Sequence, residues 1–178
     1  MACDLTQGRA EVCKESVGGL QGVYFLNYET GSAFTKNAGG EITGDFSGET
    51  VYYYELKGTS ALVETVNSSR ENGTTFFSQE LTLNLKKLTN EMTTQLKLMA
   101  YGRPRVIVHT NAGDALLVGE LRGADVTGGT IQTGGGLGDL YGYSVTFTAE
   151  EPLPASFISG STVSDPFAAI TAPTIVRS

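Results

Sequence analysis

Residues 75–86, TFFSQELTLNLK, carry the most regular pattern in the chain, and this pattern restricts the fold more than any other. Phe77, Leu81, Leu83 and Leu85 lie on one side of the pattern, and polar residues lie on the other. Successive side chains of a β-strand point to opposite faces of a sheet, so an alternating segment is typical of a half-buried strand. The fold is therefore expected to contain a sheet with one face on a core and one face on solvent.

The period changes directly after this strand. Apolar residues recur at the spacing of one helical face, at Leu88, Met92, Leu96 and Met99. This stripe predicts one amphipathic helix over residues 89–101 that packs against the core. Thr89 is a suitable N-cap, and Gly102 followed by Pro104 is a suitable end.

Further strands are predicted on both sides of the helix, at residues 22–28, 51–57, 61–69, 104–110, 115–121, 124–133 and 141–150. The first of these has apolar residues on both faces and is expected to be buried on both. Residues 58–60 and 111–114 are turn signals, so 51–57 with 61–69 and 104–110 with 115–121 are expected to form β-hairpins. The chain is therefore predicted to be mainly β, as an antiparallel β-sandwich or a partly closed barrel with one flanking α-helix, long loops and extended termini.

A chain of 178 residues is long enough for one domain with extensions. We expect an N-terminal arm over residues 1–21, a β-sandwich or barrel domain over 22–150, and an extended C-terminal tail over 151–178. The tail holds four of the five prolines and shows no sustained period, yet it is too apolar for an ordinary linker. We therefore expect it to be loosely held in an isolated copy and to dock on a neighbouring subunit.

A glycine-rich segment lies between the last two predicted strands, in IQTGGGLGDLYGYSV, residues 131–145. A phosphate-binding glycine loop needs set spacing and a helix after it. Here a strand follows, Tyr141 stands where the last glycine of such a motif belongs, and no Gly-Lys-Ser/Thr occurs. No nucleotide or other cofactor is predicted, and the segment is interpreted as a flexible finger that another protein orders.

No catalytic or metal site is predicted. Cys3, Cys13 and His109 are the only cysteines and histidine, too few for a four-ligand zinc site of the common kind. The serines lack a Gly-x-Ser-x-Gly setting, and the acidic residues Asp114, Glu120 and Asp139 are scattered. The chain is not expected to be an enzyme, although a carboxylate pair formed by folding stays open.

The start of the chain has no signal-peptide core, and no apolar stretch reaches the ~18 residues that span a membrane. We expect a soluble product of a cytosol with no membrane partner. A disulfide between Cys3 and Cys13 is possible by spacing, but reduced thiols fit such a compartment better.

The net charge of −7 and the pI of about 4.7 indicate that the chain lacks the broad basic surface that binds phosphate groups. The basic residues form only two short pairs, at Lys86 with Lys87 and at Arg103 with Arg105. High-affinity binding to nucleic acid is therefore not expected.

The long loops and the extended termini indicate that the chain assembles with other subunits. A glycine-rich loop at residues 30–49, the glycine finger at 128–140, the apolar tail and the N-terminal arm leave surface that neighbouring subunits would cover. The candidate subunit contacts are Gly134, Gly135, Gly136, Leu137, Gly138, Phe34, Phe46, Phe157, Ile158 and Phe167.

Residues 75–158, from TFFSQELTLNLKKLTNEM through the glycine finger to AEEPLPASFI, resemble virion proteins of tailed bacteriophages with the tail-tube fold. The opening MACDLTQGRAEVCKESVGGLQGVYF is similar to the starts of structural proteins in phages of Bacteroidota, including crAss-like phages. The resemblance implies a tail tube or a tail or neck ring protein, made in the host cytoplasm and located in the virion tail. Identical subunits and other tail or neck proteins would be its partners, and DNA would pass its acidic channel without specific binding. No catalytic position carries over.

Two other classes of function stay open. In the first, a monomeric β-sandwich binds carbohydrate or a cell surface, with the tyrosines of VYYYE at residues 51–55 as a platform. In the second, an enzyme site assembles from the distant carboxylates. Rings or tubes in solution would favour assembly, and a strict monomer that binds glycans would favour the first alternative.

Overall fold

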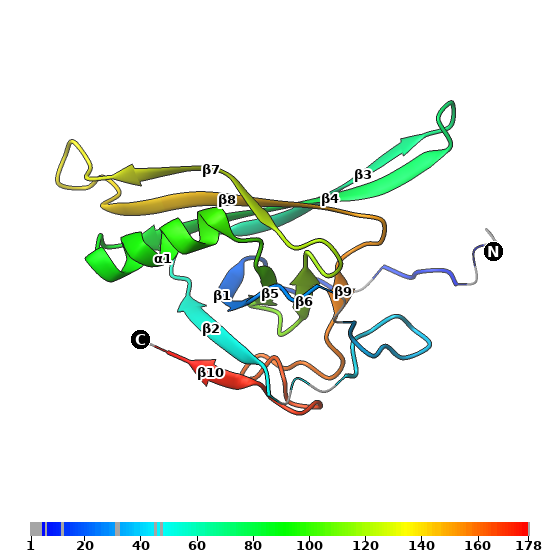
Figure 1. Cartoon of the computed structure of the whole chain (residues 1–178). Coiled ribbons are helices and arrows are strands. Elements are labelled where there is room, and N and C mark those ends of the chain that lie inside the picture. Colours follow the sequence, from blue (N-terminus) through cyan, green and yellow to red (C-terminus); the bar gives the residue numbers. More distant parts are fainter. Residues whose placement is uncertain are drawn as a thin grey trace.

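The computed structural model describes residues 5, 7–11, 13–30, 33–44, 46 and 48–177. Its elements in chain order are β1 (Leu20–Leu26), β2 (Thr50–Glu55), β3 (Ala61–Ser69), β4 (Thr74–Lys86), α1 (Asn90–Tyr101), β5 (Arg105–Thr110), β6 (Ala115–Val118), β7 (Asp125–Gln132), β8 (Gly142–Glu151), β9 (Ser156–Phe157) and β10 (Thr174–Val176). They form a six-stranded sheet in the order β10-β2-β1-β5-β6-β9 and a four-stranded sheet in the order β3-β4-β8-β7 (Figure 1). The sheets pack face to face, so the prediction of a mainly β sandwich with one helix is confirmed.

The four-stranded sheet is built on β4, the half-buried strand predicted from its alternation. Leu81 and Leu83 of β4 are fully buried, and they face Phe147 and Val145 of β8 in an antiparallel register. Together with residues from β1, β5 and β6 they form the core between the two sheets. The pattern of residues 75–86 therefore predicted both the strand and its buried face.

The six-stranded sheet is buried on both faces. On β1, Val23 and Phe25 point into the core between the sheets, while Tyr24 and Leu26 point into a second core on the other face. This double burial was predicted from the apolar residues on both sides of residues 22–28. The second core is covered by residues from 33–46 and from the C-terminal segment, including Ile42 and Phe167.

The C-terminal residues 151–178 differ from the expected loose tail. Residues of β9 pair with β6, Ile158 bridges to Ile42, and β10 pairs in parallel with β2. The segment adds a strand at each edge of the six-stranded sheet and covers its outer face. An exposed face carrying Tyr24 and Ile107 would cost much free energy, and the chain's own tail removes it from water.

The expected hairpin between residues 51–57 and 61–69 is wrong. β2 pairs with β1 and β10, whereas β3 pairs with β4 in the other sheet, so residues 58–60 cross from one sheet to the other. The crossing is fixed on β4, where the Asn84 N–H donates to Ser60 Oγ at 3.1 Å. The second predicted hairpin is present, since β5 pairs with β6 in an antiparallel register.

Helix α1 begins and ends where the sequence predicts. Thr89 Oγ1 accepts the Met92 N–H at 3.1 Å, and the Gly102 N–H donates to the Leu98 carbonyl at 2.9 Å. The stripe of Leu88, Met92, Leu96 and Met99 packs against the core between the sheets. No helix in the described part of the chain is long and apolar enough to cross a membrane.

The N-terminal residues preceding β1 are exposed wherever the structure describes them. Cys13 is an exposed free thiol. Cys3 lies outside the described residues, so the predicted state of the cysteine pair stays a prediction.

Candidate subunit interface

The two edges of the four-stranded sheet are long strands. β3 has nine residues and pairs on one side with β4, and β7 has eight residues and pairs on one side with β8. Monomeric proteins usually protect such edges with proline, lysine, bulges or very short strands. Neither strand contains proline or lysine, and the one register shift in β7, between Val126 and Gly128, leaves residues 128–132 regular.

The face of the four-stranded sheet that points away from the core is polar. Its central strands present Ser78, Glu80, Thr82, Asn84 and Lys86 from β4, and Ser144, Thr146, Thr148 and Glu150 from β8, by strand alternation. Its edges add Asp125, Thr127, Thr130 and Gln132 from β7, and Thr65 and Asn67 from β3. Two exposed apolar side chains, Val63 and Phe76, lie on the same face. On this face three carboxylates, from Glu80, Glu150 and Asp125, stand against the one ammonium of Lys86, so the face is hydroxyl-rich and weakly acidic.

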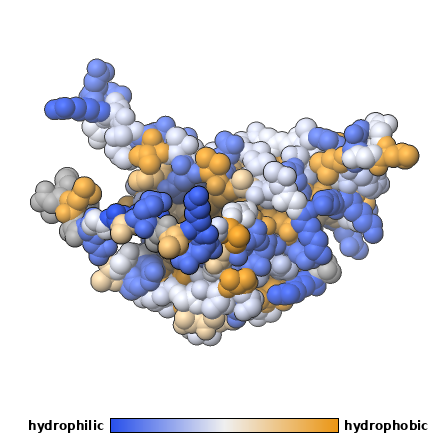
Figure 2. Space-filling model, turned by 180° about the vertical axis from the view of Figure 1, so that it is seen from behind, coloured by the Kyte–Doolittle hydropathy of each residue, from blue (hydrophilic) through white to orange (hydrophobic). Residues whose placement is uncertain are grey.

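The β3–β4 hairpin extends beyond the body as an arm (Figure 1). Near its base and along its length Val63, Val66 and Phe76 are exposed at 57%, 60% and 37% of their surface. In Figure 2 the arm stands out at the upper left, and its tip is hydrophilic. By strand alternation Val63 and Phe76 lie on the outward face of the hairpin and Val66 lies on the opposite face.

The five predicted contact residues of the glycine finger, Gly134 to Gly138, lie together in the β7–β8 loop at the end of the sheet opposite the arm (Figure 1). The Asp139 carboxylate accepts the Gly135 N–H at 3.0 Å and the Gly136 N–H at 2.7 Å. These two bonds, that from Gly136 first, lower the pKa of Asp139. The loop therefore has a turn structure of its own, with Leu137 fully exposed at the tip.

The five predicted apolar contacts divide into two groups. Phe34, Phe46, Ile158 and Phe167 meet in the second core, where the rings of Phe34 and Phe46 stack with centroids 5.0 Å apart. Phe46, Ile158 and Phe167 are at most 2% exposed, so their prediction as subunit contacts is wrong. Phe157, on the edge strand β9, is 48% exposed and is accessible to a neighbour.

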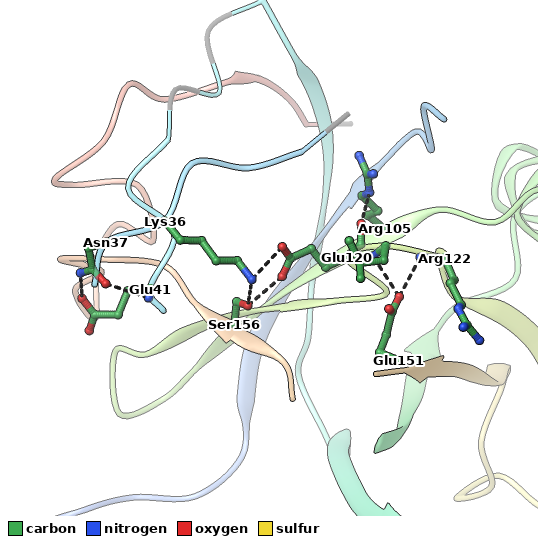
Figure 3. Close-up of polar contacts among 9 residues, drawn as sticks. Lys36, Asn37, Glu41, Arg105, Glu120, Arg122, Glu151 and Ser156 are labelled. Atoms are coloured by element: carbon green, nitrogen blue, oxygen red, sulfur yellow. Dashed lines mark hydrogen bonds and ion pairs between the residues drawn. The ribbon is translucent and has the colours of Figure 1, made fainter. Parts of the chain in front are cut away.

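A half-buried polar cluster lies between the end of β6, the loop of residues 33–44 and β9 (Figure 3). Lys36 Nζ lies 2.8 Å from Glu120 Oε1 and donates to Ser156 Oγ at 2.9 Å. The Ser156 hydroxyl donates in turn to Glu120 Oε2 at 2.7 Å. Because Lys36 and Ser156 both bind the Glu120 carboxylate, the trio ties the loop and β9 to the residues that follow β6.

The predicted acidic residues do not assemble into one site. Glu120 belongs to this polar cluster, Asp114 lies in the β5–β6 turn, and Asp139 lies in the glycine loop. No group of three His, Cys, Asp or Glu side chains in the described residues is placed to hold a metal ion.

Two open hollows lie beside α1, with volumes of about 630 and 500 Å³. They share Tyr52, Tyr54 and Gln95, and Tyr52 is 38% exposed. Burial raises the pKa of Tyr54, and the neighbouring Tyr52 adds to the shift. The sequence singled out these tyrosines, but it gave no signal that the helix would form the opposite wall.

The sequence missed the two edge strands as a site. It predicted the segments themselves, yet an edge is defined by which strand lies beside it in space, and the expected pairing of 61–69 with 51–57 hid the free edge of β3. Comparison with family models, curated proteins and solved structures finds no match to this chain.

Proposed function

We propose that this chain is a structural subunit of a bacteriophage virion that assembles with copies of itself into rings or a tube, forming part of the tail channel for DNA. The observation that carries the proposal is the pair of long edge strands of the four-stranded sheet, β3 and β7, each of which has a strand partner on one side only among the described residues. The resemblance of residues 75–158 to tail-tube virion proteins supports the same reading.

The strand directions suit such an assembly. Each neighbouring pair in the order β3-β4-β8-β7 is antiparallel, so β3 and β7 run in opposite directions. Pairing of β7 in one copy with β3 in the next is then also antiparallel. A head-to-tail contact of this kind uses two different edges and closes into a ring when the rotation between copies allows it.

The polar face suits a channel. The six-stranded sheet covers one face of the four-stranded sheet, so a closed ring of these sheets leaves the hydroxyl-rich, weakly acidic face free to line the lumen. An acidic lumen repels phosphate and offers no basic grip, so DNA passes without being bound. The arm and the glycine loop, at opposite ends of the sheet, are then placed to contact the preceding and following layers (Figure 1).

Light scattering after size-exclusion chromatography tests the proposal, with one lysine placed on each edge. Val63→Lys in β3 and Thr130→Lys in β7 are expected to leave monomers, whereas the unaltered chain forms rings or tubes. Thr146→Lys on the central strand β8 is the matched control, because it adds the same charge to the same face away from the edges. Edge variants that assemble as fully as the control would contradict the proposal.

A carbohydrate- or cell-surface-binding module is the second candidate, and the hollows that share Tyr52 and Tyr54 favour it. Exposed tyrosine beside amide side chains is a common surface for a sugar. Calorimetric titration with glycans separates the two candidates. If this function holds, Tyr52→Ala abolishes binding by a monomer and Tyr53→Phe, on the opposite face of β2 against Tyr24, leaves it intact.

A further inference from the structure

Glu151, the last residue of β8, is a buried carboxylate with its two oxygens in unequal surroundings. The side chain is 2% exposed. Its Oε1 accepts the backbone N–H groups of Leu121 and Arg122 at 3.0 and 2.8 Å (Figure 3). Its Oε2 is buried and has no hydrogen-bond partner among the described residues of the protein.

A buried carboxylate oxygen that accepts no hydrogen bond lowers the stability of the fold. A buried acceptor without a donor loses its hydration and gains nothing in return, and the loss is larger for a charged group. Buried carboxylates in native proteins are therefore paired, hydrogen-bonded or solvated. Arg122 contributes its backbone N–H to Oε1, so its contact leaves Oε2 unsatisfied.

A small cavity adjoins Glu151, and its wall is formed by Gln79, Glu120, Leu121, Glu151, Leu153 and Pro154. Its volume is about 10 Å³. This is about the smallest space that holds one water molecule, and it is too small for an organic ligand. Apolar cavities of this size stay dry, but here three of the six wall residues carry polar side chains.

We propose that one ordered water molecule occupies this cavity and donates a hydrogen bond to Glu151 Oε2. Gln79, which is 1% exposed, and Glu120 supply further polar groups on the wall. The water completes a clamp between the sheets. Gln79 Oε1 accepts the Gly119 N–H at 3.0 Å, so Gln79 and Glu151 both reach from the four-stranded sheet to the backbone of residues 119–122 after β6.

Two alternatives to a water would also satisfy Glu151 Oε2. A bound cation would neutralise the carboxylate directly, and a proton on Oε2 would turn the acceptor into a donor. A cation shows oxygen neighbours at about 2.0–2.6 Å. A water shows them at about 2.7–2.9 Å, the range of an O–H···O bond to a carboxylate or carbonyl. The two are therefore distinguishable by distance.

The experiment is a crystal structure of the full chain at a resolution that shows ordered water, together with Glu151→Gln and Glu151→Leu. We expect one peak of water density beside Oε2 in the unaltered chain. It persists in Glu151→Gln, whose amide donates to the water in place of accepting from it, and is lost in Glu151→Leu. An empty cavity, a peak at cation distances, or an Oε2 bonded directly to a protein acceptor would each overturn the proposal.

Magnetic relaxation dispersion of water, which counts long-lived internal waters in solution, gives an independent readout that does not depend on crystals. The unaltered chain and Glu151→Gln are expected to hold one more such water than Glu151→Leu. Equal counts in all three chains would overturn the proposal even if Glu151→Leu proved less stable for other reasons.

Discussion

At the scale of single residues, Asp139 shows how one carboxylate shapes a glycine-rich loop. Glycine loses more conformational freedom on ordering than any other residue, so three successive glycines need a specific partner to adopt one turn. The Asp139 carboxylate supplies it by accepting two backbone N–H groups. The sequence placed the glycines at a strand connection, but the reach of Asp139 back to Gly135 depends on the backbone turn itself.

This arrangement predicts that the loop loosens in acid. Because the pKa of Asp139 is lowered in the fold, its contribution is present above the ordinary pKa of an aspartate and is lost as the pH falls through the lowered value. The protection factors of the Gly135 and Gly136 amides, which compare their NMR-measured exchange with that of an unstructured peptide at the same pH, are expected to fall in that range. Asp139→Ala should give low protection factors at every pH. Asp139→Asn keeps one acceptor oxygen and should show no such pH dependence.

The buried aromatic residues predict a stability effect. Phe167→Ala removes a ring that is 1% exposed and packs against Tyr24 and Phe46, so we expect a loss of about 3–5 kcal/mol in the free energy of unfolding. Phe157→Ala, at a side chain 48% exposed, should cost far less. Urea unfolding of the two variants measures the difference. Similar losses would contradict the assignment of Phe167 to the core.

At the scale of elements, the sequence predicted segments that carry their own period. β4 and α1 were located almost to the residue because alternation and the helical stripe are local properties. Pairing is not local. Residues 58–60 signal a turn but do not tell which sheet receives the next strand, and β9 and β10, with two and three residues, are too short to show any pattern.

The short strand β10 predicts an effect of truncation. Removing residues 174–178 strips the partner from β2 and uncovers its edge, so a lower Tm and more aggregation are expected. Differential scanning calorimetry with light scattering measures both. Removing residues 1–11 is the control, because the described residues among them are exposed, and it should leave the Tm unchanged. Equal behaviour of the two truncations would show that β10 adds nothing.

At the scale of the whole molecule, the chain covers more of its own surface than the sequence suggested. The apolar tail was expected to dock on a neighbour, yet Ile158 and Phe167 cover the outer face of the chain's own six-stranded sheet. Sequence alone cannot separate these cases, since an apolar segment looks the same whichever copy it packs on. The proposed assembly therefore uses the open edges of β3 and β7, and the tail belongs to the chain's own fold.

Electron microscopy of the purified chain under conditions that promote assembly tests this claim most directly. We expect rings or tubes in which β7 of each copy lies beside β3 of the next and the polar face of the four-stranded sheet lines the lumen. Particles in which β3 and β7 stay exposed while other surfaces make the contacts, or a chain that remains monomeric at every concentration, would contradict the account.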